Sequence, residues 1–286
     1  MKKEILLVIA LIIIFCVPNS PQSAGYLVSI GGGDKTTEIM QKIVDLAGGK
    51  DSKIVVIPNA SSEPLESARY NMDEFMNLGC SNISYLYCNG EEANQDSNIK
   101  KLEGITGIFF GGGDQAFLTR DLLGTKLLDK IFQIYNSGGV ISGTSAGAAV
   151  MSKVMITGNE LINTDSTEAF NIIEKGNIET IEGFGFLTNA VIDQHFIKRK
   201  RNNRLITVIL EHPKLLGIAI DESTAIVVNP DNTFEVIGES QVVIYDANEA
   251  DHIKTNELGK LSVNNLKMNI LFNGEKFDMN KRKTIE

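Results

Sequence analysis

The segment Gly143–Gly147 (GTSAG) constrains the fold of this chain more than any other part of its sequence. It follows the apolar run 139–142 and precedes the small apolar residues 148–151, an order that indicates a strand, a sharp turn and a helix. A G-x-S-x-G turn in that setting holds its serine in a strained backbone conformation that only small neighbours tolerate. Ser145 is therefore a candidate nucleophile, and the N–H of Ala146 is a candidate donor to an oxyanion. The alternative is a turn rich in Gly and Ala that only packs a helix on a strand.

Strand and helix patterns alternate through the first half of the chain. The strands are continuously apolar, which predicts a mainly parallel sheet covered by helices on both faces. The expected strands are 26–30, 53–58, 83–87, 107–110 and one from 140 onward, and the expected helices are 37–47, 63–78, 116–123 and 127–135. In such a sheet a ligand lies beyond the carboxyl ends of the strands.

The pattern changes after the GTSAG turn. Residues 155–187 are polar and glycine-rich and predict an excursion over the surface, followed by a strand at 190–193 and a helix at about 200–211. Four short strands between 217 and 245 indicate an antiparallel addition to the parallel sheet. No linker, repeat or low-complexity tract divides the chain, so we expect one α/β domain over residues 25–286.

Residues 1–24 have the layout of a secretory signal peptide. Lys2 and Lys3 precede 13 apolar residues at 5–17, and a small, polar tail ends at Ala24. Thirteen residues are fewer than the roughly 20 that a membrane-spanning helix needs. We expect cleavage after Ala24 and a secreted or cell-envelope protein. An uncleaved membrane anchor is the alternative, because Gln22 fits the cleavage site poorly.

The net charge and the cysteines narrow the classes of partner and of site. A formal charge of −9 leaves no broad basic surface, so no nucleic-acid partner is expected. Export would permit disulfides, but the strand expected between Cys80 and Cys88 holds their Cα atoms too far apart for a bridge. We expect two separate buried thiols. No pattern in the sequence indicates a metal or a cofactor.

A serine nucleophile needs a base and an orienting carboxylate. His195 follows the predicted strand 190–193, which places it at the same sheet edge as Ser145. Asp221 and Glu222 follow another strand at that edge, and either carboxylate could orient the histidine. The alternatives are a structural histidine and a solvated acidic turn. The order serine, histidine, acid differs from the serine, acid, histidine order of α/β-hydrolases.

A glycine-rich turn follows the strand 107–110. Its glycines allow the backbone to approach a ligand closely, so Gly113 and Asp114 could supply an oxyanion N–H opposite Ala146. A similar turn at 31–34 follows the first strand, and neither turn has the spacing of a dinucleotide fingerprint. Both turns could equally be structural.

The basic run 198–204 begins three residues after His195. On a helix Arg201 and Arg204 share one face, and guanidinium groups beside a base could clamp a substrate carboxylate. The alternative is a solvated basic helix face.

Together these segments resemble the cyanophycinases, exopeptidases of a serine peptidase family that also holds aspartyl dipeptidase. The resemblance covers about residues 25–246, and it rests on NASSEP at 59–64, GGGDQ at 111–115, GTSAG at 143–147, DQHF at 193–196 with three arginines, and DES at 221–223. It implies an α/β fold related to class I glutamine amidotransferase domains. It also implies Ser145 as nucleophile, His195 as base and Glu222 as the third member. The substrate pocket that it implies is shaped by Gln115, Asp193, Gln194, Arg199, Arg201 and Arg204.

The substrate implied by this resemblance is cyanophycin, a poly-aspartate backbone with arginine attached to each side-chain carboxyl, which is cleaved to β-Asp-Arg dipeptides. Each unit carries a free arginine carboxylate, so the arginine-rich segment favours cyanophycinase over aspartyl dipeptidase. The signal peptide departs from the familiar intracellular enzyme and suggests an exported form. An aspartyl dipeptidase-like peptidase and a non-catalytic secreted homologue are the alternatives. The sequence leaves a homodimer open.

Overall fold

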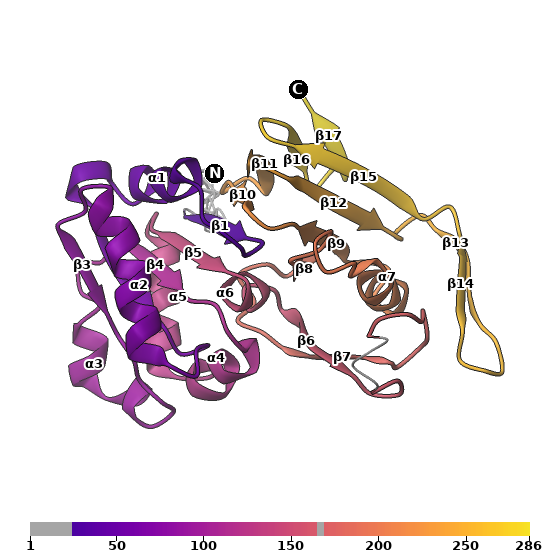
Figure 1. Ribbon diagram of the computed structural model, residues 1–286, viewed down its shortest axis with the longest axis horizontal. Helices are drawn as coiled ribbons and strands as arrows, with labels where there is room; N and C mark the ends of the chain where they lie inside the picture. The colour runs from indigo at the N-terminus through magenta and orange to yellow at the C-terminus, as the bar shows by residue number, and fades with distance from the viewer. Residues whose placement is uncertain (1–24, 165–168) are drawn as a thin grey trace, which may run out of the picture.

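The computed structural model describes residues 25–164 and 169–286. Its central sheet has five parallel strands: β1 (Tyr26–Ile30), β2 (Lys53–Ile57), β3 (Asn82–Tyr85), β4 (Gly107–Phe110) and β5 (Val140–Thr144). Four antiparallel strands extend it: β10 (Thr224–Val228), β11 (Thr233–Gly238), β16 (Lys276–Asp278) and β17 (Lys283–Ile285). The order is β17-β16-β11-β10-β1-β5-β4-β2-β3, which places β1 and β5 near the middle (Figure 1).

Helices cover both faces of this sheet, because its central strands are apolar on both sides. On one face, α1 (Thr37–Leu46) and α2 (Pro64–Asn77) pack against buried residues such as Val28 and Phe109. On the other face lie α4 (Gln115–Leu122), α5 (Lys126–Asn136) and α6 (Ala146–Ala149), which pack against residues such as Ile108 and Ile141. Short helical turns at Gly49–Asp51, Glu92–Asn94 and α3 (Asp96–Lys100) complete this half.

A second sheet packs beside the first. It consists of β8 (Ala190–Gln194), β9 (Leu216–Ile220), β12 (Gln241–Asp246) and β15 (Lys267–Phe272), in the order β15-β12-β9-β8. One face contributes Ile218 and Ile244 to the core shared with β10 and β11. Helix α7 (Asn202–Glu211) covers the other face (Figure 1). The N–H of His195 donates to the carbonyl of Gly31 at 2.7 Å, so the carboxyl ends of β8 and β1 meet.

Two ribbons extend from these sheets: β6 (Val154–Glu160) with β7 (Ile178–Glu182), and β13 (Asp251–Thr255) with β14 (Leu261–Asn264). The first ribbon corrects the expectation that residues 155–187 only cross the surface, because Met155, Ile156 and Ile178 are buried in the core. The segment after Tyr245 lies beyond the family resemblance, and it adds β15 to one sheet and β16 to the other.

The α/β class, the parallel first half and the antiparallel addition agree with the sequence predictions. Helix α7 differs, because Lys200 has a φ of 54° and Arg201 immediately precedes the helix rather than lying in it. Cys80 and Cys88 are free and buried, which confirms two separate thiols. Within residues 25–164 and 169–286, no helix is long and apolar enough to cross a membrane. The predicted signal peptide at 1–24 lies outside the described residues.

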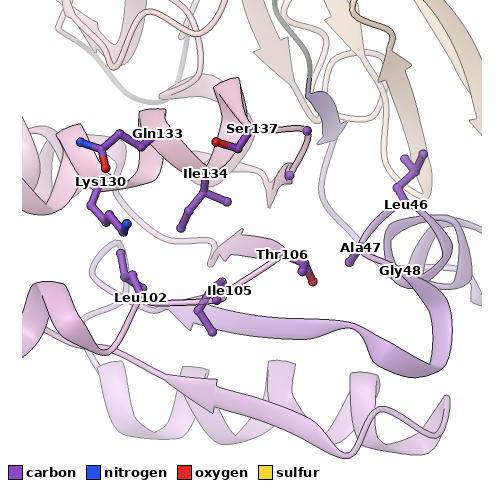
Figure 2. A pocket seen from close by; sticks show the side chains of 13 residues that line it. Leu46, Ala47, Gly48, Leu102, Ile105, Thr106, Lys130, Gln133, Ile134 and Ser137 are labelled. Atoms are coloured by element: carbon purple, nitrogen blue, oxygen red, sulfur yellow. The ribbon is translucent and has the colours of Figure 1, made fainter.

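A cavity of about 440 Å³ lies at the amino-terminal ends of β4 and β5 (Figure 2). Its walls come from the end of α1, the end of α5 and the residues that lead into the two strands, such as Thr106 and Gly139. In an open α/β sheet the ligand site lies at the opposite, carboxyl edge. Because this cavity lies at the amino-terminal edge, it is not the expected ligand site despite its volume.

Candidate active site

Ser145 lies in the turn between β5 and α6 with a backbone conformation that L-residues rarely adopt. Its φ is 54° and its ψ is −109°, which is the strained geometry expected of a nucleophile elbow. The N–H of Ser145 donates to the carbonyl of Ile30 at the end of β1, at 2.9 Å. The turn therefore projects the hydroxyl beyond the carboxyl edge of the sheet.

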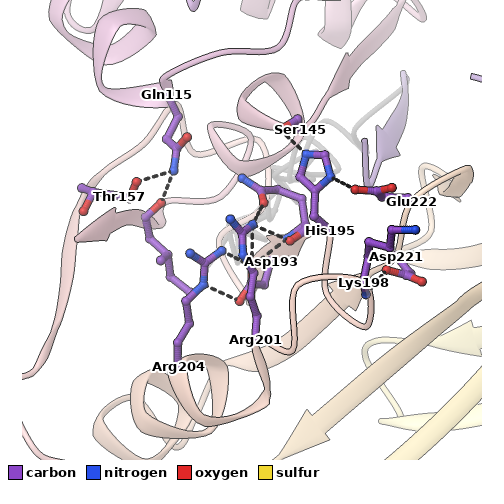
Figure 3. A network of polar contacts seen from close by, with 12 residues as sticks. Gln115, Ser145, Thr157, Asp193, His195, Lys198, Arg201, Arg204, Asp221 and Glu222 are labelled. Atoms are coloured by element: carbon purple, nitrogen blue, oxygen red, sulfur yellow. Dashed lines mark hydrogen bonds and ion pairs between the residues drawn. The ribbon is translucent and has the colours of Figure 1, made fainter. Parts of the chain in front are cut away.

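His195 and Glu222 complete a hydrogen-bonded triad with this serine (Figure 3). Ser145 Oγ lies 2.8 Å from His195 Nε2, and His195 Nδ1 lies 2.7 Å from Glu222 Oε1. A carboxylate accepts only, so Nδ1–H donates to Glu222 and Nε2 is left to accept from the serine hydroxyl. This arrangement can remove the proton from Ser145 and stabilise the resulting imidazolium.

The structure distinguishes between the two carboxylates that the sequence left open. Asp221 accepts hydrogen bonds from the N–H of Lys198, at 2.9 Å, and from the hydroxyl of Ser240, at 2.8 Å. It therefore fixes the loop after β8, while the neighbouring Glu222 contacts His195.

The glycine-rich turn at 31–34 supports the histidine. A Cβ atom on Gly32 would lie 2.2 Å from His195 Cε1, and the φ of Gly32 is +102°. Only glycine lets the imidazole lie against this turn. The glycines of this turn are evident in the sequence. Their contact with His195 could not be predicted from it, because the contact depends on how the two sheets pack together.

Of the three backbone donors considered for an oxyanion, two are available. Among the described residues, nothing accepts a hydrogen bond from the N–H of Gly113 or of Ala146. The N–H of Asp114 instead donates to the carbonyl of Ala60 at 2.8 Å, and its carboxylate caps α4 by accepting from the N–H of Ala116. This corrects the prediction for Asp114, whose role is to shape the turn that presents Gly113.

Arg204 is buried against Asp193. Its side chain is 2% exposed, Nε donates to Asp193 Oδ2 at 2.9 Å, and Nη2 donates to Asp193 Oδ1. Removing one partner of such a buried pair typically costs about 3–5 kcal/mol, because the other charge is left uncompensated. Two nitrogens of Arg204 are therefore engaged by Asp193 rather than free for a substrate carboxylate, and the side chain does not lie on a solvated face.

Of the remaining predicted pocket residues, Arg201 and Gln115 make hydrogen bonds near the triad (Figure 3). Arg201 donates from Nη1 to the backbone and side-chain oxygens of Gln194, while its buried Nε has no partner among the described residues. Gln115 donates from Nε2 to the carbonyls of Ile156 and Thr157, at 2.7 and 2.8 Å, and so ties α4 to β6. Arg199 is exposed.

Burial and positive charge shape the titration of this site. Burial lowers the pKa of His195 below 6.5, the hydrogen bond to Glu222 opposes this shift, and the charges of Arg199 and Arg201 lower the pKa further. Burial and the neighbouring Arg204 lower the pKa of Arg201 to about 10. Near pH 7 the His195 imidazole is therefore uncharged and able to accept a proton, while Arg201 keeps its positive charge.

Comparison with known proteins identifies the group to which this architecture belongs. Residues 27–236 match the family described as Peptidase family S51. Cyanophycinase of Synechococcus elongatus is 34% identical over 265 residues, which cover 89% of this chain and 79% of that protein. Cyanophycinase of Geminocystis herdmanii is 35% identical over 257 residues, which cover 87% of this chain and 92% of that protein.

A solved structure shares the fold. The crystal structure of a peptidase from an acI-B1 actinobacterium superposes with a TM-score of 0.65 at 22% identity, and the match covers 90% of this chain and 98% of that one. The arrangement of sheets and helices described above is therefore also found in an experimentally determined peptidase structure.

The lowered pKa of His195 predicts the pH dependence of activity. With the neutral imidazole as the expected base, kcat/KM should fall as pH decreases, with a midpoint below 6.5. Arg199→Gln removes a charge that lowers this pKa, so its midpoint should move upward. Lys50→Gln, at the opposite edge of the sheet, is the control and should not shift it. Kinetics from pH 4 to 9 test this, and an unchanged or lower midpoint in Arg199→Gln would contradict the electrostatic account.

Proposed function

The chain belongs to peptidase family S51 and is a serine-type peptidase, and on that premise we propose that it hydrolyses cyanophycin to β-Asp-Arg dipeptides through an acyl-enzyme on Ser145. The observation that carries the mechanism is the pair of short contacts at His195, 2.8 Å to Ser145 Oγ and 2.7 Å to Glu222 Oε1. The identity of the substrate rests on the relatives, which are named cyanophycinases and match over most of this chain.

In the acylation step, Ser145 Oγ attacks the carbonyl carbon of an aspartyl peptide bond in the polymer backbone. Its proton passes to His195 Nε2, and Glu222 stabilises the imidazolium through Nδ1–H. The N–H groups of Gly113 and Ala146 hold the developing oxyanion. When the tetrahedral intermediate collapses, the C–N bond breaks, and the leaving amine takes the proton from His195. Ser145 is then esterified by the remaining polymer.

Deacylation repeats these steps with water as the nucleophile. His195 accepts a proton from the water molecule that attacks the ester carbonyl, and it returns this proton to Ser145 Oγ as the ester breaks. The products are a polymer shortened by one unit and a free β-Asp-Arg dipeptide. All the acid–base chemistry is supplied by the triad.

The charges around the triad suit the polymer. Each unit of cyanophycin carries a carboxylate and a guanidinium on its arginine. Arg199 and Arg201 supply positive charge for the carboxylate, and the unpaired Nε of Arg201 is a donor that a carboxylate can accept from. Arg204 acts indirectly, because its bond to Asp193 fixes the carboxyl end of β8 from which Gln194 and His195 follow.

Digestion of purified polymer tests the proposal. The wild-type protein should solubilise cyanophycin and release β-Asp-Arg as the main product, identified by mass spectrometry. Ser145→Ala should lower kcat by about 10⁴-fold or more while the thermal unfolding midpoint stays unchanged, because only one oxygen is removed. Activity should persist in the presence of a chelator.

Two outcomes would contradict this proposal. Wild-type-like activity in Ser145→Ala would exclude the serine mechanism. The wild-type protein could instead be folded, leave cyanophycin intact and cleave N-terminal aspartyl dipeptides. Its substrate would then be short peptides and not the polymer. Asn77→Leu, on the exposed end of α2, is the matched control and should behave as the wild type does.

Export belongs to the same proposal. Cyanophycin that lies outside the cell is within reach of this enzyme only if residues 1–24 direct secretion. Strand β1 begins at Tyr26, whose N–H donates to the carbonyl of Gly139, so removal of residues 1–24 leaves the described hydrogen bonds of the sheet intact. N-terminal sequencing of protein from the medium or envelope should find a start near Gly25. A start at Met1 in an envelope protein would support an anchor, and full-length protein confined to the cytosol would refute export.

A further inference from the structure

A second cavity borders Ser145 on the side of α2. Its volume is about 270 Å³, and its lining includes Gly32, Lys35, Tyr70, Asn71, Gly113 and Ser145. None of the arginines of the run 198–204 is among these residues. Polar residues other than the arginines of the run 198–204 therefore also line the space next to Ser145.

One wall of this cavity, at Gly32, lies against the imidazole of the general base. Gly32 lies so close to the imidazole that a Cβ atom on it would be 2.4 Å from His195 Nε2. The leaving amine takes its proton from this nitrogen, so the unit that departs must lie next to it. A wall shared with Gly32, together with the oxyanion donor Gly113, makes the cavity a place for the leaving unit of the substrate.

Lys35 brings a buried positive charge to this wall. Its side chain is 4% exposed, with Nζ 2.9 Å from Glu74 Oε2 and 4.6 Å from the centre of the Tyr70 ring. An ammonium group has three N–H donors, and the Glu74 carboxylate lies within reach of one of them. The face of the Tyr70 ring stabilises the charge without using a second donor in a conventional hydrogen bond. Lys35 can therefore donate to a further acceptor in the cavity.

Asn71 independently indicates a ligand here. The residue is 3% exposed, and its Nδ2 donates to the carbonyl of Ser67 at 2.7 Å, which fixes the orientation of the amide. Its Oδ1 has no hydrogen-bond partner among the described residues. An unsatisfied buried acceptor costs about 1–3 kcal/mol, and an N–H of a bound ligand would recover it.

From these contacts we propose that Lys35 binds a free carboxylate on the terminal unit of the substrate, and that Asn71 accepts a hydrogen bond from the same unit. The inference rests on the proposed cyanophycin hydrolysis. Two carboxylates of that unit share this chemistry: the main-chain terminus and the carboxylate of the attached arginine. Bound to the main-chain carboxylate, Lys35 sets the preference for the carboxyl end of the polymer, because only the last unit carries that group. Bound to the arginine carboxylate, which every unit carries, Lys35 sets the preference for an arginine-bearing leaving unit.

Three synthetic trimers of β-Asp-Arg separate these possibilities. One has both carboxylates of the last unit free, one carries an amide at the main-chain terminus, and one carries an amide on the last arginine. The wild-type protein should cleave the free acid about 10- to 100-fold better in kcat/KM than one of the two amides, as expected for a hydrogen bond between charged groups. The amide that is cleaved slowly identifies the carboxylate that Lys35 binds.

The variant Lys35→Met/Glu74→Gln removes both charges together, so no buried carboxylate is left unpaired. It should lose the preference, so that kcat/KM for the free acid equals that for the amide that the wild-type protein cleaves slowly. Glu74→Gln alone keeps the ammonium and should keep the preference. Lys267→Met/Glu249→Gln makes the same two changes in an exposed ion pair and is the matched control.

Equal wild-type rates on all three trimers would overturn the inference, even if the double variant fails to fold. A preference that survives in the folded Lys35→Met/Glu74→Gln variant would also overturn it. A folded wild-type protein that cleaves none of the three trimers would instead refute the proposed function, and this inference with it.

Discussion

The strained backbone at Ser145 is the constraint on which the rest of the site depends. A φ of 54° with a ψ of −109° is unfavourable for serine, and the surrounding structure must impose it. The N–H of Ser145 is fixed by Ile30, while the Ser145 carbonyl accepts from the N–H groups of Ala148 and Ala149. A Cβ atom on Gly147 would lie 2.2 Å from the carbonyl oxygen of Phe110, so α6 packs directly on β4 only because this residue is glycine.

The triad joins two sheets, and its geometry depends on how they pack. Ser145 follows β5 of the central sheet, whereas His195 and Glu222 follow β8 and β9 of the second sheet. The turn at 31–34 connects them, because Gly31 accepts from the N–H of His195 and Gly32 accepts from the N–H of Ser223 at 2.9 Å. The shared core between the sheets therefore positions His195 against Ser145, and a substitution far from the site that alters this packing should change the triad geometry.

Much of this arrangement could be predicted from the sequence where the signal is local. The small residues around Ser145 predict the turn, and the position of His195 after a strand predicts the edge at which it lies. Local pattern alone does not choose between Asp221 and Glu222, since adjacent residues share every local signal and only their contacts differ; the family resemblance is what implied Glu222. The pairing of Arg204 with Asp193 was also missed, because it depends on where α7 begins relative to β8.

The subsite residues on α2 show the same limit. Tyr70 and Asn71 form part of an ordinary helix pattern in the sequence, and only the fold brings them beside Ser145. Lys35 directly follows the glycine-rich turn at 31–34, which local spacing could not distinguish from a structural one. Strands β15 and β16 were not predicted, because they pair with β12 and β11, which lie earlier in the chain.

Ser145 as the nucleophile is the central claim, and covalent labelling tests it most directly. The protein is treated with an alkyl fluorophosphonate, and at each time point the fraction of modified Ser145 is measured by peptide mapping alongside cyanophycin hydrolysis. Activity should fall in proportion to the modified fraction, and the polymer should protect Ser145 from the reagent. Full activity after complete modification of Ser145 would contradict the account.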